Sequence, residues 1–298
     1  MFKKIFTLLS TTCLLASSLS GCGIAPVSTS LSGASSGLSI LKKTFKHGLG
    51  CNLDGMKKLT ESDSYEIQAA LPEKIDLRSG CSPITNQGVT NACVGFASVD
   101  GLAEFVAKKQ GHPMDFAPRY IWNLSRKQDK SLDQNIGTHI YVATERIDNM
   151  GLVAEEAFPF PSDKEQADEK TLMKFVSEAP PNALIAQAKK NRIIKGWKQI
   201  ASVHAMKKSL SDGMPVVFAI AVFDNIAQSN STGNIPLPTE KSEVLGGHAI
   251  VCVGYDNAKK VFIIRNSWGT AWGDKGYGYL PYEFVKIGAT YEGFTAKI

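Results

Sequence analysis

Three side chains of the types used in nucleophilic catalysis lie in separate motifs of this chain. Cys93 comes two residues after Asn91, a candidate N-cap, at the start of an expected helix. Unpaired backbone amides at a helix start stabilise a thiolate, so a cysteine there has a lowered pKa and becomes a nucleophile. His248 follows two glycines, and Asn266 begins the run Asn-Ser-Trp-Gly. A histidine can hold the cysteine as a thiolate and protonate a leaving amine, while an amide orients the imidazole.

Each of these residues alone also has an ordinary structural interpretation. Free cysteine usually packs as a small apolar side chain, a histidine in an apolar strand usually belongs to the core, and Asn-Ser-Trp-Gly can be a turn with a packed tryptophan. The coincidence of the motifs in one chain favours catalysis over these readings. The remaining histidines are interpreted as core or surface residues: His47, His112, His139 and His204.

In order and spacing, Gln87, Cys93, His248 and Asn266 resemble the catalytic set of the papain-like cysteine peptidases, and the match extends from about residue 71 to 282. The resemblance implies a Cys-His ion pair with a thiol pKa well below that of an ordinary cysteine. It also implies an oxyanion hole made by Gln87 and the Cys93 backbone amide, and a Trp268 that shields the His-Asn hydrogen bond from water.

Substrate-binding positions are also carried over from the resemblance. They are Gly137, Gly247 and Trp268. The chain departs from the usual Cys-Gly-Ser-Cys-Trp, because it has Thr90-Asn91-Ala92-Cys93-Val94 and therefore lacks both the disulfide partner before the nucleophile and the tryptophan after it. A bacterial branch with Cys-Val-x-Phe-Ala at the nucleophile is more similar.

Helices are expected to follow the nucleophile. Apolar residues recur at helical spacing from Cys93 to Val106, and Pro118 is placed to open a second helix. Thr138 is a candidate cap for a third helix that ends at Gly151. A capping-box pattern at Ser162 and Glu165 precedes a fourth, and further apolar spacing predicts a helix at 201–211.

Apolar runs in the second half of the chain predict buried strands at 215–222, 248–255, 261–264 and 275–281. Helices first and antiparallel strands second make an α+β protein. The resemblance implies the papain-like two-domain fold, with a helical domain, an antiparallel β-barrel-like domain and the active-site cleft between them. We assign residues 71–298 to this peptidase body, the helical half at about 81–180 and the β-rich half at about 190–298.

The N-terminal residues have the composition of an export signal. A basic start precedes an apolar run that is too short to span a membrane, and Leu-Ser-Gly then leads to Cys22. This resembles a bacterial lipobox, with 1–21 as signal peptide and Cys22 as the lipidated residue; a plain signal peptide is the alternative. Residues 22–40 are small and polar and predict a flexible tether. The protein is thus expected outside the cytoplasm, anchored to a bacterial membrane (outer membrane or periplasm) or secreted.

Residues 41–70 are interpreted as a short prosegment-like region, because the stretch is too short for the helical prodomain of the family. In an oxidising compartment we expect a Cys51–Cys81 disulfide that staples this region to the body; two free thiols are the alternative. Cys252 is expected to pack as a buried thiol in its apolar strand.

The composition limits the classes of partner that the protein is expected to bind. A formal net charge of +5 without a long basic run gives no indication of nucleic-acid binding. No metal or cofactor motif is assigned, and a monomer is expected. The predicted function is a cysteine peptidase, most simply an endopeptidase, acting on proteins or peptides through an acyl-enzyme. A non-catalytic or acyl-transferring relative that binds peptides in the same cleft is the alternative.

Overall fold

The computed structural model describes residues 47–61 and 70–297. The expected signal peptide, the lipidated Cys22, the tether and the first residues of the prosegment-like region lie outside these ranges. No helix within the described ranges is long and apolar enough to cross a membrane.

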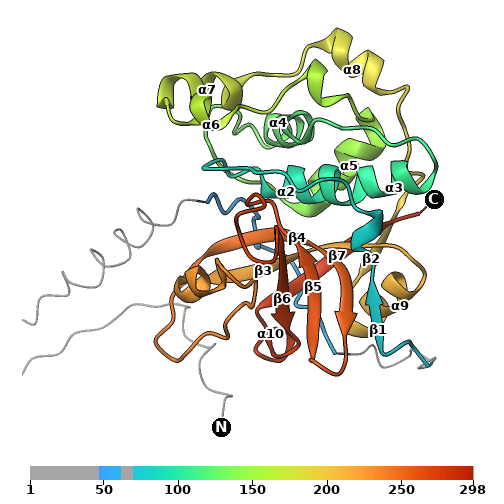
Figure 1. Cartoon of the computed structure of the whole chain (residues 1–298). Coiled ribbons are helices and arrows are strands. Elements are labelled where there is room, and N and C mark those ends of the chain that lie inside the picture. Colours follow the sequence, from blue (N-terminus) through green and yellow to red (C-terminus); the bar gives the residue numbers. More distant parts are fainter. Residues whose placement is uncertain (1–46, 62–69, 298) are drawn as a thin grey trace, which may run out of the picture. The chain divides into compact units, whose positions relative to one another are not determined.

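A seven-stranded antiparallel sheet occupies the C-terminal half (Figure 1). Its central strands, β3 (Val216–Phe223) and β4 (Val244–Asp256), are apolar and almost wholly buried, as their continuous hydrophobic runs predict. Along the sheet the strands follow the order β2 (Trp197–Ile200), β7 (Thr290–Ala296), β3 (Val216–Phe223), β4 (Val244–Asp256), β5 (Val261–Arg265) and β6 (Tyr277–Pro281), and β1 (Lys74–Asp76) pairs with β4.

The helical half lies on the other side of the helix that begins with Cys93 (Figure 1). That helix is continuous from α2 (Cys93–Phe96) through a π-helical stretch, Ala97–Ala103, into α3 (Glu104–Lys109). Beyond it lie α4 (Pro118–Gln128), α5 (Ile140–Met150), α6 (Asp163–Gln166), α7 (Glu169–Ser177) and α8 (Asn182–Ala188), while α9 (Val203–Ser211) and α10 (Glu283–Lys286) belong to the sheet half.

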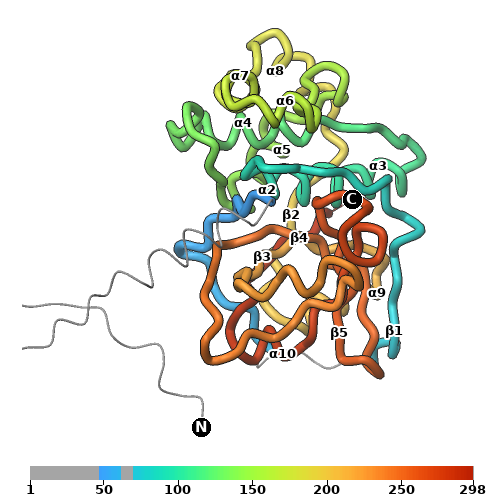
Figure 2. Tube along the Cα trace, turned by 60° about the vertical axis from the view of Figure 1, so that its left-hand side comes forward, coloured from blue at the N-terminus to red at the C-terminus, as the bar shows by residue number. Residues whose placement is uncertain are grey.

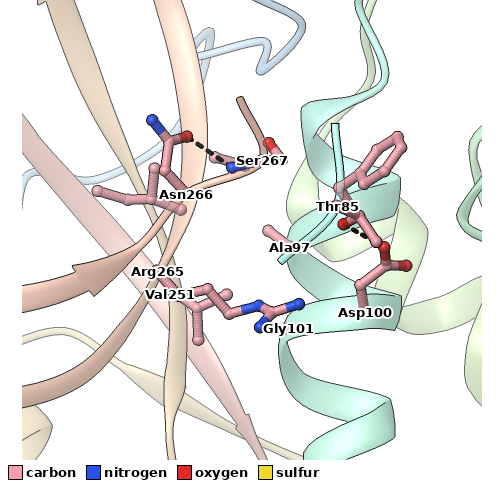
Figure 3. Close-up of a pocket in the computed structure, with 11 residues that line it drawn as sticks. Thr85, Ala97, Asp100, Gly101, Val251, Arg265, Asn266 and Ser267 are labelled. Carbon is pink, nitrogen blue, oxygen red and sulfur yellow. Dashed lines mark hydrogen bonds between the residues drawn. The ribbon is translucent and has the colours of Figure 1, made fainter. Parts of the chain in front are cut away.

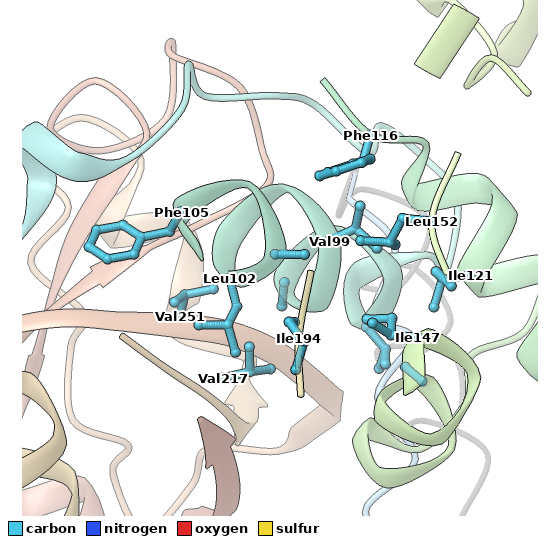
Figure 4. Packing of buried hydrophobic residues seen from close by; sticks show 14 of the residues in the cluster. Val99, Leu102, Phe105, Phe116, Ile121, Ile147, Leu152, Ile194, Val217 and Val251 are labelled. Carbon is cyan, nitrogen blue, oxygen red and sulfur yellow. The ribbon is translucent and has the colours of Figure 1, made fainter. Parts of the chain in front are cut away.

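The central helix packs against both halves (Figure 4). Leu102 faces Val217 and Val251 of the sheet, and Val99 lies near Leu152 of the helical half. A Cβ at Gly101 would lie 2.3 Å from a methyl of Val251, so glycine lets the helix approach the sheet closely at this position. One apolar core therefore holds the start of α2 in a fixed place relative to β4.

Most of the predicted elements are confirmed, and the α+β class with them. Pro118 occupies the first turn of α4, Gly151 ends α5 with φ of 73°, and Ser162 and Glu165 form the expected capping box.

Three details of the prediction are wrong. Asn91 does not cap α2, because Ala92 is the N-cap residue and the Asn91 side chain is bound elsewhere. Thr138 does not cap α5, since its hydroxyl donates to Asp129. The capping box opens only the short α6, and the helix expected after it begins separately as α7 with Asp168 as its cap.

Candidate active site

Cys93 lies at the start of α2 with its sulfur enclosed by backbone amides. The sulfur accepts hydrogen bonds from Ala249 N of β4 at 3.4 Å and from Gly50 N at 3.3 Å, with further contributions from the amides of Val94 and Cys93 itself. The side chain is fully buried, and loss of solvation raises the pKa of the thiol to about 11 despite these donors. In this state Cys93 is a protonated thiol.

His248 and Asn266 meet across the β4–β5 hairpin. His248 Nε2 and Asn266 Oδ1 are 2.8 Å apart, and the same oxygen accepts from Ser267 N at 2.8 Å. Because Oδ1 can only accept, Nε2 carries the proton and Nδ1 is the basic nitrogen of the neutral ring. Among the described residues, none makes a hydrogen bond with this Nδ1.

Trp268 covers this pair. Its ring stacks on His248 with centroids 4.7 Å apart, and both side chains are buried. Burial lowers the pKa of His248 to about 4, against the opposing effect of the hydrogen bond to Asn266. The imidazole is therefore neutral. The predicted ion pair with Cys93 is wrong for this state of the protein, in which both side chains are buried away from water.

Gln87 is held with its amide nitrogen toward the cleft. Its Oε1 accepts from Ser267 Oγ at 2.6 Å, which leaves Nε2 to donate to Thr90 O at 2.8 Å and to Gly48 O at 3.0 Å. Ser267 is a functional residue that sequence reasoning missed, although it lies inside the Asn-Ser-Trp-Gly run. It fixes the orientation that an oxyanion-hole donor at position 87 needs.

Figure 3 shows a small pocket between the central helix and the sheet, lined by the polar side chains of Thr85, Asp100 and Arg265 among others. The Arg265 guanidinium donates to Ser82 O at 2.6 Å and Pro83 O at 2.7 Å, and Thr85 Oγ1 donates to Asp100 Oδ2 at 2.7 Å. The chain leading to Gln87 is thus bound both to the end of β5 and to the central helix, so the two sides of the site are fixed to each other.

The cleft is filled by the chain's own segment 47–52, which we call the closing segment. Figures 1 and 2 show this blue stretch running beside the start of α2 and beside β3 and β4. Five successive backbone amides bind cleft atoms: Gly48 N to Gly88 O at 3.1 Å, Leu49 N to Asn91 Oδ1 at 2.9 Å, Gly50 N to Cys93 Sγ, Cys51 N to Gly247 O at 3.0 Å and Asn52 N to Thr138 O at 3.0 Å.

All three predicted substrate-binding residues contact this segment. A Cβ at Gly137 would lie 1.7 Å from Gly50 O, and one at Gly247 would lie 2.2 Å from Cys51 O, so both positions admit the segment's backbone only as glycine. Trp268 stacks on His47 with centroids 4.8 Å apart. The structure therefore brings these residues together with Gln87, Cys93, His248 and Asn266 around one extended peptide.

The closing segment is not bound in a position that allows Cys93 to cleave it. Attack requires the carbonyl next to the sulfur to direct its oxygen at the oxyanion donor. Here the peptide at the sulfur presents the N–H of Gly50, while Gln87 Nε2 donates to the carbonyl of Gly48, one peptide earlier. This register leaves the segment bound and intact.

The residues after the closing segment attach it to the sheet half. A turn closes from Met56 N to Leu53 O at 3.2 Å, with Gly55 at φ of +72°. Leu59 is then 2% exposed within the core around β3 and β4, and its amide donates to Thr290 O at 3.1 Å. The segment is therefore the end of an arm whose base belongs to the folded body.

The predicted Cys51–Cys81 disulfide is contradicted, since both thiols are free and buried. Cys51 N donates to Gly247 O in the cleft, whereas Cys81 Sγ lies 3.7 Å from Leu77 O and near the charge of Arg265. Different parts of the body hold the two residues. No group of three or more potential metal ligands occurs in the part of the chain that the structure describes.

A family model described as "Papain family cysteine protease" matches residues 71–289. The chain belongs to the papain family of cysteine proteases. Xylellain, a cysteine protease from Xylella fastidiosa, superposes with a TM-score of 0.73 at 26% identity, over 85% of this chain and 96% of that one. A cysteine protease of Carica candamarcensis, solved in complex with E-64, shares the fold with a TM-score of 0.58 and 20% identity, over 76% of this chain and 99% of that one.

Two curated proteins are similar to this chain in sequence. An uncharacterised peptidase C1-like protein of Acanthamoeba polyphaga mimivirus is 28% identical over 207 residues, which is 67% of this chain and 64% of that protein. Mouse cathepsin K is 26% identical over 226 residues, 72% of this chain and 61% of its own length. The chain thus spans somewhat less than two thirds of the length of these curated relatives.

The buried thiol gives a testable pH dependence. In the full chain, alkylation of Cys93 should rise with a midpoint near pH 11, because only the thiolate reacts. In Gly50→Ala the new Cβ would meet Asn91 O at 1.8 Å and displace the segment, so water returns and the midpoint should fall below about 8.5. Alkylation rates followed by mass spectrometry across pH provide the measurement.

Asp54→Ala is the matched control, since this side chain is exposed in the same arm. It should keep the midpoint of the parent chain. Equal midpoints in the parent and in a folded Gly50→Ala variant would show that the segment does not set the reactivity of Cys93.

Proposed function

We propose that this protein is a cysteine peptidase that hydrolyses peptide bonds in proteins or peptides, and that its cleft is closed until the segment 47–52 leaves. One observation carries the proposal: Cys93 and a neutral His248 lie in one cleft, and Asn266 and Ser267 fix the protonation of the imidazole so that Nδ1 is basic. The membership of the papain family supports the same chemistry.

In the opened cleft the steps follow from these positions. His248 Nδ1 takes the proton of Cys93, and the thiolate attacks the carbonyl carbon of the bound peptide. Gln87 Nε2 and the Cys93 amide donate to the oxyanion that develops. The imidazolium protonates the leaving amine, which leaves a thioester on Cys93. Water, deprotonated by the same histidine, then releases the acid and restores the thiol.

The path of the closing segment supports an endopeptidase, which cleaves bonds in the interior of a substrate chain. The segment extends from His47 on Trp268, past the sulfur at Gly50, to Asn52 at Thr138, so the cleft accepts an extended backbone on both sides of Cys93. An endopeptidase needs such space on both sides of the bond that it cuts. We therefore assign endopeptidase activity on protein or peptide substrates.

The first test combines labelling with turnover. The epoxide E-64 should modify Cys93 in the Gly50→Ala variant, and this variant should hydrolyse a fluorogenic peptide library. Cys93→Ala should abolish both, whereas Asn266→Ala should lower kcat by roughly 10- to 100-fold, because Asn266 orients the base without exchanging protons.

A folded, open variant that binds peptides but neither reacts with E-64 nor cleaves any of them would instead identify a peptide-binding relative. Equal losses in Asn266→Ala and Cys93→Ala would contradict the division of roles between these two residues.

We further propose that the protein acts outside the cytoplasm, attached to a bacterial membrane by a lipid on Cys22. The run Leu-Ser-Gly-Cys after a short apolar stretch supports this location. Cys22→Ala should move the protein from the membrane to the soluble fraction of the producing cells. An unchanged distribution, with no lipid mass on the N-terminal peptide of the parent protein, would contradict the anchor.

A further inference from the structure

A second thiol lies in the closed cleft beside the nucleophile. Cys51 directly follows Gly50, whose amide contacts Cys93 Sγ at 3.3 Å, and its own amide donates to Gly247 O at 3.0 Å. The α-carbons of Gly50 and Cys51 are about 3.8 Å apart, as in any trans peptide. The Cys51 side chain therefore starts one residue after the amide that contacts the Cys93 sulfur. Both thiols are buried in the same apolar cluster.

Cys51 and Cys93 also interact electrostatically. Burial raises the pKa of Cys51 well above its ordinary value, and ionisation of the neighbouring Cys93 raises it further. The other described thiols are placed differently. Cys252 Sγ lies 3.3 Å from Gly254 O in the core on the other face of β4, and Cys81 Sγ lies at Leu77 O. Cys51 is therefore the thiol that the fold brings to the nucleophile.

We propose that Cys51 and Cys93 form a reversible disulfide that locks the closing segment in the cleft, so that a thiol reductant is needed to release the site. The proposal rests on the proposed peptidase function, whose nucleophile the disulfide would block. It makes Cys51 a site of redox modification and gives the segment a covalent as well as a hydrogen-bonded closed state.

The oxidant is a low-molecular-weight disulfide, R–S–S–R. With the segment displaced, the Cys93 thiolate attacks one sulfur, forming Cys93–S–S–R and releasing the first R–S⁻. When the segment returns, the Cys51 thiolate attacks Cys93 Sγ and expels the second R–S⁻. Two protein thiols thus lose two electrons and two protons, and R–S–S–R becomes two R–SH. A dithiol attacks the Cys51–Cys93 bond, is oxidised to its cyclic disulfide and returns both protein thiols.

The arm permits the adjustment that the bond requires. A disulfide holds its Cβ atoms about 3.5–4.5 Å apart. The closing segment is joined to its base by the turn at 53–56, where Gly55 has positive φ and open space around its α-carbon. A small shift of the segment along the cleft is therefore possible while Leu59 stays buried in the core.

The experiment uses the full chain with oxidised glutathione as the disulfide, followed by intact-mass measurement and non-reducing peptide mapping. We expect a mass lower by two hydrogens and a cross-linked peptide pair joining Cys51 to Cys93. Labelling by E-64 should be at least tenfold slower in the oxidised than in the reduced protein, and dithiothreitol should restore it.

The variants separate this bond from general oxidation. Cys51→Ser should show no cross-link and should instead carry a glutathione adduct on Cys93, whereas Cys81→Ser should cross-link as the parent does. A parent chain that gives the same adduct as Cys51→Ser, with Cys51 free to alkylate, would overturn the proposal. So would a cross-link from Cys51 to Cys81.

The cross-link is read by mass and does not depend on turnover, so the two proposals fail separately. A Cys51–Cys93 bond in a protein whose open variant cleaves no peptide supports the redox lock and contradicts the peptidase. Cleavage by the open variant, without a Cys51–Cys93 bond in the parent, supports the peptidase function and contradicts the disulfide.

Discussion

Five successive backbone N–H groups, from Gly48 to Asn52, each donate a hydrogen bond to the cleft, and one of them donates to the sulfur of Cys93. Each hydrogen bond contributes only about 0.5–1.5 kcal/mol to stability, but together they hold an extended peptide in the cleft in place of water. The electrostatic state of the site follows from this contact. With water excluded, both Cys93 and His248 are driven to their neutral forms.

The contact depends on a scaffold that brings together distant parts of the chain. Core packing fixes the start of α2 against β4, and the hairpin of β4 and β5 places His248 beside Asn266. Arg265 ties the chain before Gln87 to the same hairpin. Glycines in both the cleft and the closing segment then let the two backbones approach closely, as in the pairing of Gly50 with Gly137. Larger side chains at these positions would hold the cleft open.

The sequence was sufficient to predict what depends on local patterns and on recognisable motifs. The α+β class, the opening of α4 at Pro118 and the buried strands followed from residue type and spacing. The candidate catalytic residues were named because each belongs to a motif, and the structure places them together. Ser267 could have been named from the same run, since its neighbours on both sides were.

The closing segment could not be predicted in the same way. Its glycines and single leucine show no periodicity, and its partners lie about 40 to 200 residues away in the chain, where only the folded body brings them together. For the same reason the sequence suggested a disulfide between Cys51 and Cys81, two thiols that the fold holds in different parts of the body. The role of Asn91 was also misjudged, because its side chain does not cap the helix but accepts from Leu49 N and donates to Asn135 O.

Amide hydrogen exchange over the closing segment tests this account most directly. In the full, reduced chain at neutral pH, the amides of residues 48–52 should exchange at least a hundredfold more slowly than the same sequence in a free peptide, because each is bound and enclosed. Gly50→Ala should abolish the protection of these five amides while leaving that of β4 unchanged. Exchange of the segment at the rate of the free peptide in the parent chain would contradict a closed cleft, and with it the explanation given for the neutral Cys93 and His248.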